Sequence, residues 1–235
     1  MAINAGDTTY YQAKRGIVQD GLVLNLDAAV DQSYPGNGTT WYDLEGSNSG
    51  TLTNGPTFDR DNGGSIVFDG TDDHVAGGDT SDVDDNYSLA IWWIATGPPS
   101  NNDAAGAMLF CQSPNLQHGI IATHSWAYQR VLASHVINNA HPSNDSTALN
   151  NTINYLTNTY DGSDQKIYLN GQFSTSRSHS LDPDGSKSSY RIGKWGYSSY
   201  HRCLQGKIYS VALYNRALTA AEILQNYNAT KGRFE

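Results

Sequence analysis

Glutamate, cysteine and long apolar runs are all scarce in this 235-residue chain. With three glutamates, Glu45, Glu222 and Glu235, it has little material for the glutamate pair of a glycosidase. The two cysteines define neither a metal site nor a disulfide scaffold. No apolar run reaches the roughly 18 residues of a membrane span, and the first residues lack the apolar core of a signal peptide. We therefore expect a soluble protein made in a cytosol, without membrane insertion.

The balance of charge is acidic. Against 23 aspartates and glutamates the chain has 14 lysines and arginines, which form no evident basic cluster, and the net charge is -9. A nucleic-acid backbone would be repelled by such a surface, so we expect no nucleic-acid partner. The 23 glycines and 15 tyrosines favour short strands joined by turns over packed helices.

Strand-like and turn-like stretches alternate along most of the chain. "GLVLNLDA" and "NYSLAIWWIA" are examples of the strands, and pairs such as Asn54-Gly55 and Asn170-Gly171 mark turns that need positive φ. This pattern predicts an all-β fold, an antiparallel β-sandwich, with a single domain over residues 17–235. Residues 1–16 show no period and are either an N-terminal arm or a disordered terminus.

A short surface helix is predicted at 219–228. Thr219 followed by Glu222 forms a capping box, and Ala221 and Leu224 continue at helical spacing. Cys111 and Cys203 both lie in apolar strand-like stretches, which favours buried free thiols over a disulfide.

Several stretches together resemble the laminin-G-like, concanavalin A-like lectin/glucanase jelly rolls. They are "GGSIVFDGTDDHV", "YLTNTYDGSDQKIYLNGQ", "YRIGKW" and "LQGKIYSVALYNRALTAAEI", in an order that spans about residues 17–230. The resemblance implies that "LQGKIYSVALYN" is a central strand, and the spacing of Ile208 and Val211 suggests a bulge in it. The helix would then cover an edge or end of the sandwich.

The stretches "SYPGNGTTWYDL" and "NRALTAAEILQNYNATKGRF" further resemble the form of this domain found in structural proteins of tailed phages, including phages that infect cyanobacteria. This implies a non-enzymatic virion protein, a capsid decoration or other exterior component, assembled in the host cytoplasm. Its partners would be capsid or other virion proteins and further copies of itself. The alternative is a carbohydrate-binding module or adhesin for surface polysaccharide, and a hydrolase is a second alternative.

Calcium is the metal that the family resemblance implies, because many members bind it between strand-end loops. The candidate ligands are Asp27 after the first strand, Asp43 in "TWYDL", Asp69 in "FDG", and Asp73 or its neighbour Asp72. The alternative for each is that the carboxylate closes a turn by capping backbone N–H groups.

A ligand-binding surface is predicted in the loop "GKWGYSSYHR". Exposed aromatic rings stack on sugars and anchor protein partners, so the candidates here are Trp195, Tyr197, Tyr200 and His201, with Trp126 nearby. Trp92 and Trp93 are expected on opposite faces of one strand, which places at least one of them in the core.

Overall fold

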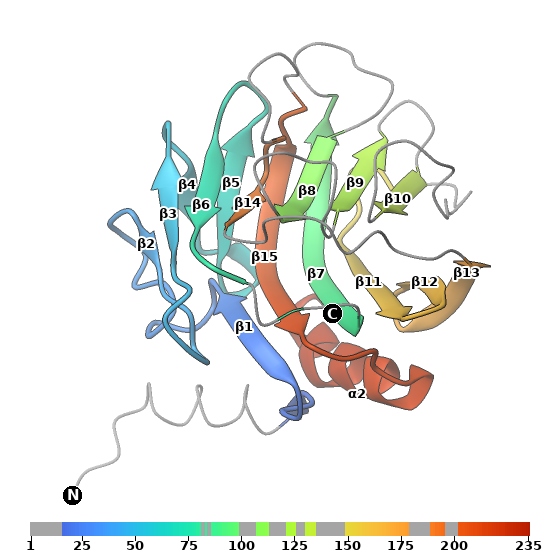
Figure 1. Cartoon of the computed structure of the whole chain (residues 1–235). Coiled ribbons are helices and arrows are strands. Elements are labelled where there is room, and N and C mark those ends of the chain that lie inside the picture. Colours follow the sequence, from blue (N-terminus) through green and yellow to red (C-terminus); the bar gives the residue numbers. More distant parts are fainter. Residues whose placement is uncertain are drawn as a thin grey trace, which may run out of the picture.

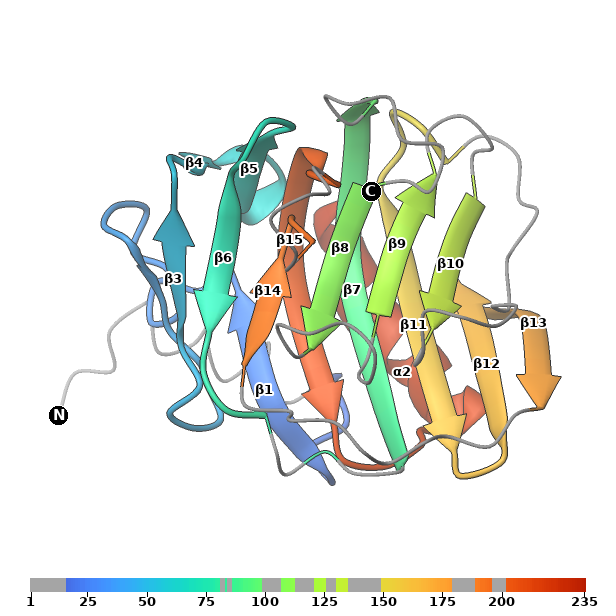
Figure 2. The same ribbon diagram turned by 45° about the horizontal axis from the view of Figure 1, so that its top comes forward.

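Strands of the described chain form two layers, as Figures 1 and 2 show. The computed structural model describes residues 16–80, 83, 86–98, 107–112, 121–125, 130–134, 149–178, 189–195 and 202–235. The two layers are antiparallel sheets that pack face to face, and a helix lies outside one of them. The predicted all-β antiparallel sandwich is therefore confirmed. Residues 1–15, nearly all of the predicted arm, lie outside the described residues.

The larger sheet has eight strands. Its order is β13-β12-β11-β7-β15-β5-β4, and β1 pairs with β15 beside this path. The strands are β1 (Leu22–Asp27), β4 (Thr57–Asp59), β5 (Ser65–Asp69), β7 (Asn86–Gly97), β11 (Asn154–Asp161), β12 (Asp164–Leu169), β13 (Gln172–Ser178) and β15 (Gln205–Tyr214).

The smaller sheet has seven strands in the order β10-β9-β8-β14-β6-β3-β2. Two single 3-10 turns, η1 (Asp61–Gly63) and η2 (Lys231–Arg233), lie outside the sheets. The strands are β2 (Thr40–Trp41), β3 (Gly50–Thr53), β6 (His74–Gly77), β8 (Ala107–Gln112), β9 (Ile121–Ser125), β10 (Arg130–Ser134) and β14 (Tyr190–Ile192).

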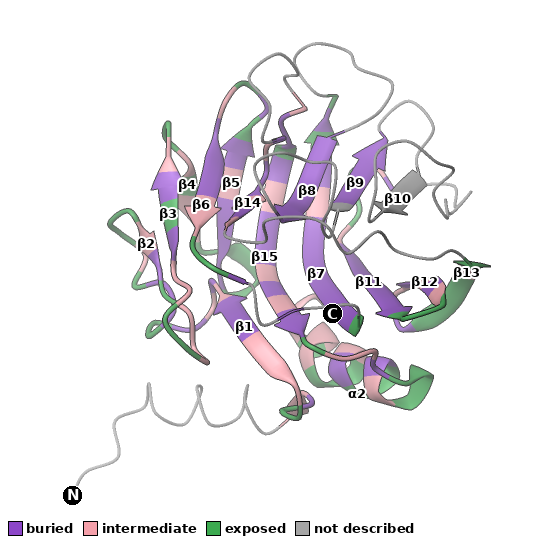
Figure 3. Cartoon of the chain, viewed as in Figure 1, coloured by how far each residue is buried: buried purple, intermediate pink, exposed green. Residues whose placement is uncertain are grey.

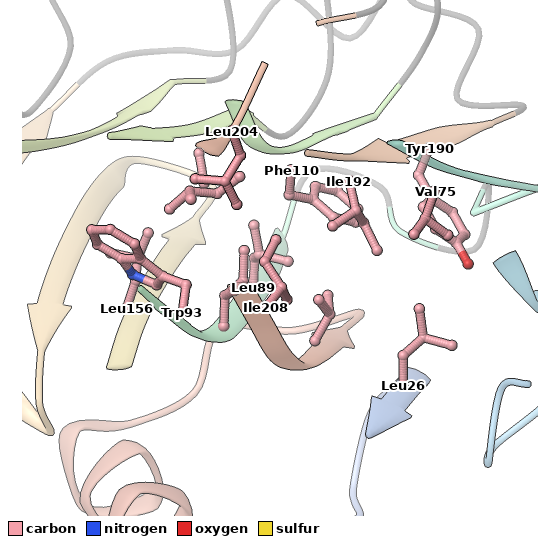
Figure 4. Packing of buried hydrophobic residues seen from close by; sticks show 14 of the residues in the cluster. Leu26, Val75, Leu89, Trp93, Phe110, Leu156, Tyr190, Ile192, Leu204 and Ile208 are labelled. Atoms are coloured by element: carbon pink, nitrogen blue, oxygen red, sulfur yellow. The ribbon is translucent and has the colours of Figure 1, made fainter. Parts of the chain in front are cut away.

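The core lies between the two sheets (Figure 4). In β7, Leu89, Ile91 and Trp93 point inward and are fully buried, because successive side chains of a strand alternate between its faces. Each fully buried aliphatic side chain of this kind stabilises the fold by roughly 1.5–3 kcal/mol. Trp92 faces the other way and is also buried, under the C-terminal segment, so both tryptophans are interior.

The strand β15 is central, as predicted, and pairs with β7, β5 and β1. Its register against β7 shifts between Ile208 and Ser210, which confirms the predicted bulge. The bulge allows Ile208 and Val211, three residues apart, both to point into the core.

The helix α2 (Ala220–Thr230) begins at the predicted capping box. The Thr219 Oγ1 atom accepts a hydrogen bond from the Glu222 backbone N–H at 3.3 Å, and the Glu222 carboxylate accepts one from the Thr219 N–H at 2.8 Å. Arg216 lies 2.6 Å from the same carboxylate and lowers the pKa of Glu222 to about 2.

This helix packs on the outer face of the larger sheet, where Ile223 contacts a cluster that includes Tyr214 and Leu218 (Figures 2 and 3). The expectation that it covers an edge or end of the sandwich was therefore wrong. The cause is the apolar outward side chains of the larger sheet, Trp92 among them, which need a cover.

Both cysteines are free and buried, as predicted. Burial raises the pKa of Cys203 to about 11, so this thiol is protonated and unreactive at neutral pH. Within the described ranges, no helix has the length and apolar content to cross a bilayer.

His124 makes the stability of the sandwich sensitive to acid. Its side chain is fully buried against Trp93, with 4.7 Å between the ring centroids. Burial lowers the pKa of His124 to about 4, although the neighbouring Asn150 side chain favours the charged form. Between pH 6.5 and 4 the unfolded chain therefore binds a proton that the folded chain does not, and stability falls as the pH falls through this window.

We expect His124→Phe to remove this part of the pH dependence, because phenylalanine keeps a ring against Trp93 but cannot be protonated. The expected difference between wild type and variant is roughly 3 kcal/mol in the change of unfolding free energy from pH 7 to pH 4. Urea denaturation at both pH values measures it. Equal losses in the two proteins would contradict the assignment to His124.

Candidate functional site

The outer face of the smaller sheet carries polar and charged side chains across neighbouring strands. Val75, Phe110 and Ile192 point into the core, so the residues next to each of them along its strand point outward. Among these, Arg191 on β14 lies directly across from Ala76 on β6 and Cys111 on β8. Arg191 is therefore in the middle of this face, with a small side chain on either side.

Trp195 lies against the same face. After β14 the chain turns at Gly193, whose φ is +85°, and Trp195 then packs against Met108 and Cys111. The indole is only 6% exposed, and the guanidinium carbon of Arg202 lies 4.7 Å from the centroid of the ring. The ring of Trp195 is therefore covered in this structure. Its role as a stacking surface for a ligand stays a prediction. Tyr197, Tyr200, His201 and Trp126 lie outside the described residues.

Positive charge gathers at this face. Arg191, Lys194 and Arg202 all come from the stretch that surrounds Trp195. Burial lowers the pKa of His74 on β6, and the nearby charges of Arg191 and Lys194 lower it further. Sequence reasoning missed this group, although three of the chain's 14 basic residues lie within one short stretch.

The turn between β5 and β6 carries an acidic cluster. The carboxylate oxygens of Asp69, Asp72 and Asp73 all lie within 4.8 Å of one another. Asp73 accepts a hydrogen bond from the Asp69 N–H at 3.0 Å, while Asp69 accepts one from the Thr71 N–H at 2.7 Å. Asn54 donates to Asp72 at 2.9 Å, which ties the cluster to the turn after β3.

Asp73 is the buried member of this cluster. Burial raises the pKa of Asp73, and the carboxylates of Asp69 and Asp72 raise it further. Three carboxylates that repel one another around a buried oxygen fit a hard divalent cation, which would relieve the repulsion. The residues of this turn therefore suit calcium.

The other two predicted ligands lie elsewhere and have protein partners. Asp27 forms an ion pair with Arg233 at 2.8 Å. The Asp43 carboxylate accepts hydrogen bonds from the backbone N–H groups of Asn25, Glu45 and Asn48. The four predicted aspartates thus do not form one site: the structure joins Asp69 and Asp73 with Asp72, and gives Asp27 and Asp43 structural roles.

Comparisons with known proteins agree on the fold. Residues 69–224, more than half of the chain, match the family model described as the concanavalin A-like lectin/glucanases superfamily. No curated protein sequence matches the chain.

Among solved structures, the chain is similar to domain 4 of AbnA, an extracellular arabinanase of Geobacillus stearothermophilus, in complex with arabinotriose. The TM-score is 0.69 at 16% identity, over 89% of this chain and 100% of that one. It is also similar to a Trypanosoma rangeli sialidase in complex with sialic acid, with a TM-score of 0.68 at 12% identity, over 96% of this chain. Only 37% of that sialidase is covered, so the chain spans well under half of its length. Identities this low establish a shared fold alone.

Calcium should stabilise the protein through Asp73. In excess chelator the ionised Asp73 carboxylate destabilises the fold once the pH rises through its raised pKa, and a bound cation would reverse this effect. We expect millimolar calcium to raise the melting temperature of the wild type at pH 7 and to have much less effect on Asp73→Asn.

Differential scanning calorimetry with and without chelator measures both melting temperatures. Asp31→Asn, which neutralises an exposed aspartate outside the cluster, serves as the matched control and should respond like the wild type. A calcium response that survives in Asp73→Asn would contradict a site in this turn.

Proposed function

Because the chain belongs to the concanavalin A-like lectin/glucanase superfamily, we propose that it is a non-catalytic carbohydrate-binding domain. The observation that carries this proposal is the outer face of the smaller sheet. There Trp195, Arg191 and His74 lie together beside the acidic turn. The similarity to an arabinanase domain that was solved with arabinotriose supports a glycan as the ligand.

The chemistry of this face suits a sugar. Guanidinium groups such as those of Arg191 and Arg202 donate hydrogen bonds to hydroxyl groups, and the covered Trp195 ring supports the Arg202 guanidinium that lies over it. A calcium ion held by Asp69, Asp72 and Asp73 would supply a Lewis-acidic centre that hydroxyl oxygens can approach. Recognition would then combine these contacts at one end of the face.

The positions of two of the three glutamates support a binding role without hydrolysis. Glu222 is held by Arg216 and Thr219 at the start of α2, and Glu235 lies 3.0 Å from Lys231. Glu222 lies in the first turn of α2, and Phe234, next to Glu235, packs against Trp92 on the outer face of the larger sheet, away from the proposed face. We therefore propose that the domain binds sugar chains and leaves them intact.

Binding should weaken when the ring at position 195 is lost. We expect Trp195→Ala to reduce affinity for a bound glycan by up to about fivefold, because the Arg202 guanidinium loses the ring that positions it, a cation–π contact worth roughly 0.5–1 kcal/mol. Trp195→Phe keeps a ring against Met108 and Cys111 and should restore much of the affinity. A glycan array identifies the ligand, and isothermal titration calorimetry measures the three affinities.

Two controls belong to this experiment. Tyr42→Ala removes an aromatic side chain that is 49% exposed outside the proposed face, and it should bind like the wild type. Thermal unfolding of each variant separates lost affinity from lost folding. The proposal fails if no glycan binds the wild type, or if Trp195→Ala and Tyr42→Ala behave alike.

We also propose a narrower setting for this domain, an exterior component of a phage virion such as a capsid decoration protein. Support comes from the stretches that resemble tailed-phage structural proteins, "SYPGNGTTWYDL" and "NRALTAAEILQNYNATKGRF". In this setting the N-terminal residues 1–16 would contact capsid or other virion proteins, and several copies would assemble on the particle.

Mass spectrometry of purified particles tests the virion setting. We expect peptides of this chain at a fixed stoichiometry to the shell protein, and cryo-electron microscopy should then place copies at regular positions on the exterior. A chain absent from particles would refute the virion setting, while the carbohydrate-binding proposal would still stand.

A further inference from the structure

A pocket lies on the side of the molecule opposite the proposed glycan-binding face, between the larger sheet and α2. It has a volume of about 40 Å³, whereas a single water needs roughly 10–15 Å³. The half-buried residues Ile17 and Leu44 line it together with the fully buried Tyr214, so it extends from partly exposed to buried surroundings. None of the residues proposed for glycan binding lines this pocket.

Small side chains create the hollow. On the outward face of the sheet, one cross-strand row runs Asn25, Ala212, Ala90, and the next row runs Asp27, Ser210, Trp92. Large side chains at the small positions would fill the space below α2, as they do around Ile223. The sheet instead has two alanines and a serine at the floor of the pocket.

The helix turns polar side chains toward this hollow. Asn226 is 1% exposed and donates to the Tyr214 hydroxyl at 3.0 Å, while Thr230 accepts from the Trp92 indole N–H at 2.8 Å. A helix that only covered a sheet would present apolar residues here. Asn226 and Thr230 are satisfied by protein partners, so the roof of the pocket is polar and already in place.

The floor offers hydrogen-bonding groups that the protein itself leaves available. Over the part of the chain that the structure describes, the Asn25 carboxamide and the Ser210 hydroxyl make no hydrogen bond to other residues, and Asn25 is 8% exposed. The Asp27 carboxylate is also at the floor, but the ion pair with Arg233 compensates its charge. A neutral ligand therefore suits the pocket better than an ion.

We propose that this pocket binds a vicinal diol, from either a free polyol or the terminal residue of a sugar chain. Asn25 and Ser210 each offer both a donor and an acceptor, which is what two adjacent hydroxyl groups require. The rings of Trp92 and Tyr155 form apolar walls for the carbon atoms of the ligand. The site is separate from the glycan-binding face, and its existence does not depend on the function proposed above.

The indole N–H of Trp92 reports on this pocket directly, because it donates to Thr230 at the pocket wall. In a proton–nitrogen correlation spectrum of the full chain, the Trp92 signal is assigned by its loss in Trp92→Phe. We expect glycerol, arabinotriose or both to shift this signal with saturation at millimolar concentrations. A response to glycerol identifies a free polyol as sufficient, and a response to arabinotriose alone identifies a sugar end.

Two variants locate the effect. Ala212→Val fills the floor and should abolish the saturable shift, while Ser210→Ala removes a single hydroxyl and should weaken binding about fivefold. Ala76→Val, the same change on the outward face of the smaller sheet, should leave the Trp92 response unchanged. If Ala212→Val does not fold, Ser210→Ala still tests the site.

The proposal is overturned if neither probe gives a saturable shift, or if the shift persists unchanged in Ser210→Ala and Ala212→Val. Binding of a glycan to the opposite face would move the Trp195 signal and not that of Trp92. Failure of one site can therefore be told from failure of the other.

Discussion

The pairing of β7 with β15 is the interaction on which the rest of the structure depends. These strands form the middle of the larger sheet, and both of their faces are covered, one by the smaller sheet and the other by the C-terminal segment. Apolar side chains are therefore buried on both faces of this pair of strands. Loss of either covering layer would expose apolar surface of the pair to water. The consecutive residues Trp92 and Trp93 are an example, because each is buried on a different face of β7.

This two-sided burial also decides where ligands can bind. The C-terminal segment packs on the outer face of the larger sheet, which is why the glycan proposal concerns the outer face of the smaller sheet, where Arg191 and Trp195 lie. The larger sheet has a small hollow under α2, because the side chains of Ala90 and Ala212 are too small to fill the space there. One fold thus offers two surfaces of different size and polarity.

Local signals made much of the fold predictable. Alternation along the strands, the capping box at Thr219 and the spacing of Ile208 and Val211 each depend on residues close in sequence, and the structure confirms all three. The position of α2 on a sheet face was not predictable. It depends on outward side chains of β7 and β15, and the alternation along these strands alone predicts that such side chains face solvent.

The candidate sites depend still more on distant contacts. The partners of Asp27 and Asp43 decide their structural roles, and Arg233 is more than 200 residues away from Asp27. Sequence proximity correctly suggested Asp69 and Asp73 as neighbours because one tight turn holds both. The pocket under α2 is lined by residues of β1, β7, β11, β15 and α2, together with Ile17 and Leu44, and no motif could have indicated it.

The central position of β15 has a consequence for the growing chain. The ribosome has synthesised all of β7 once it reaches Gly97, but β15 begins only at Gln205. While the roughly one hundred residues between them are made, one edge of β7 lacks its neighbouring strand. During that interval its apolar residues and open backbone are available to other nascent chains. Because synthesis runs from the N-terminus to the C-terminus, the middle of the larger sheet stays incomplete until late. The sheet is complete only when β15, its last strand, is inserted.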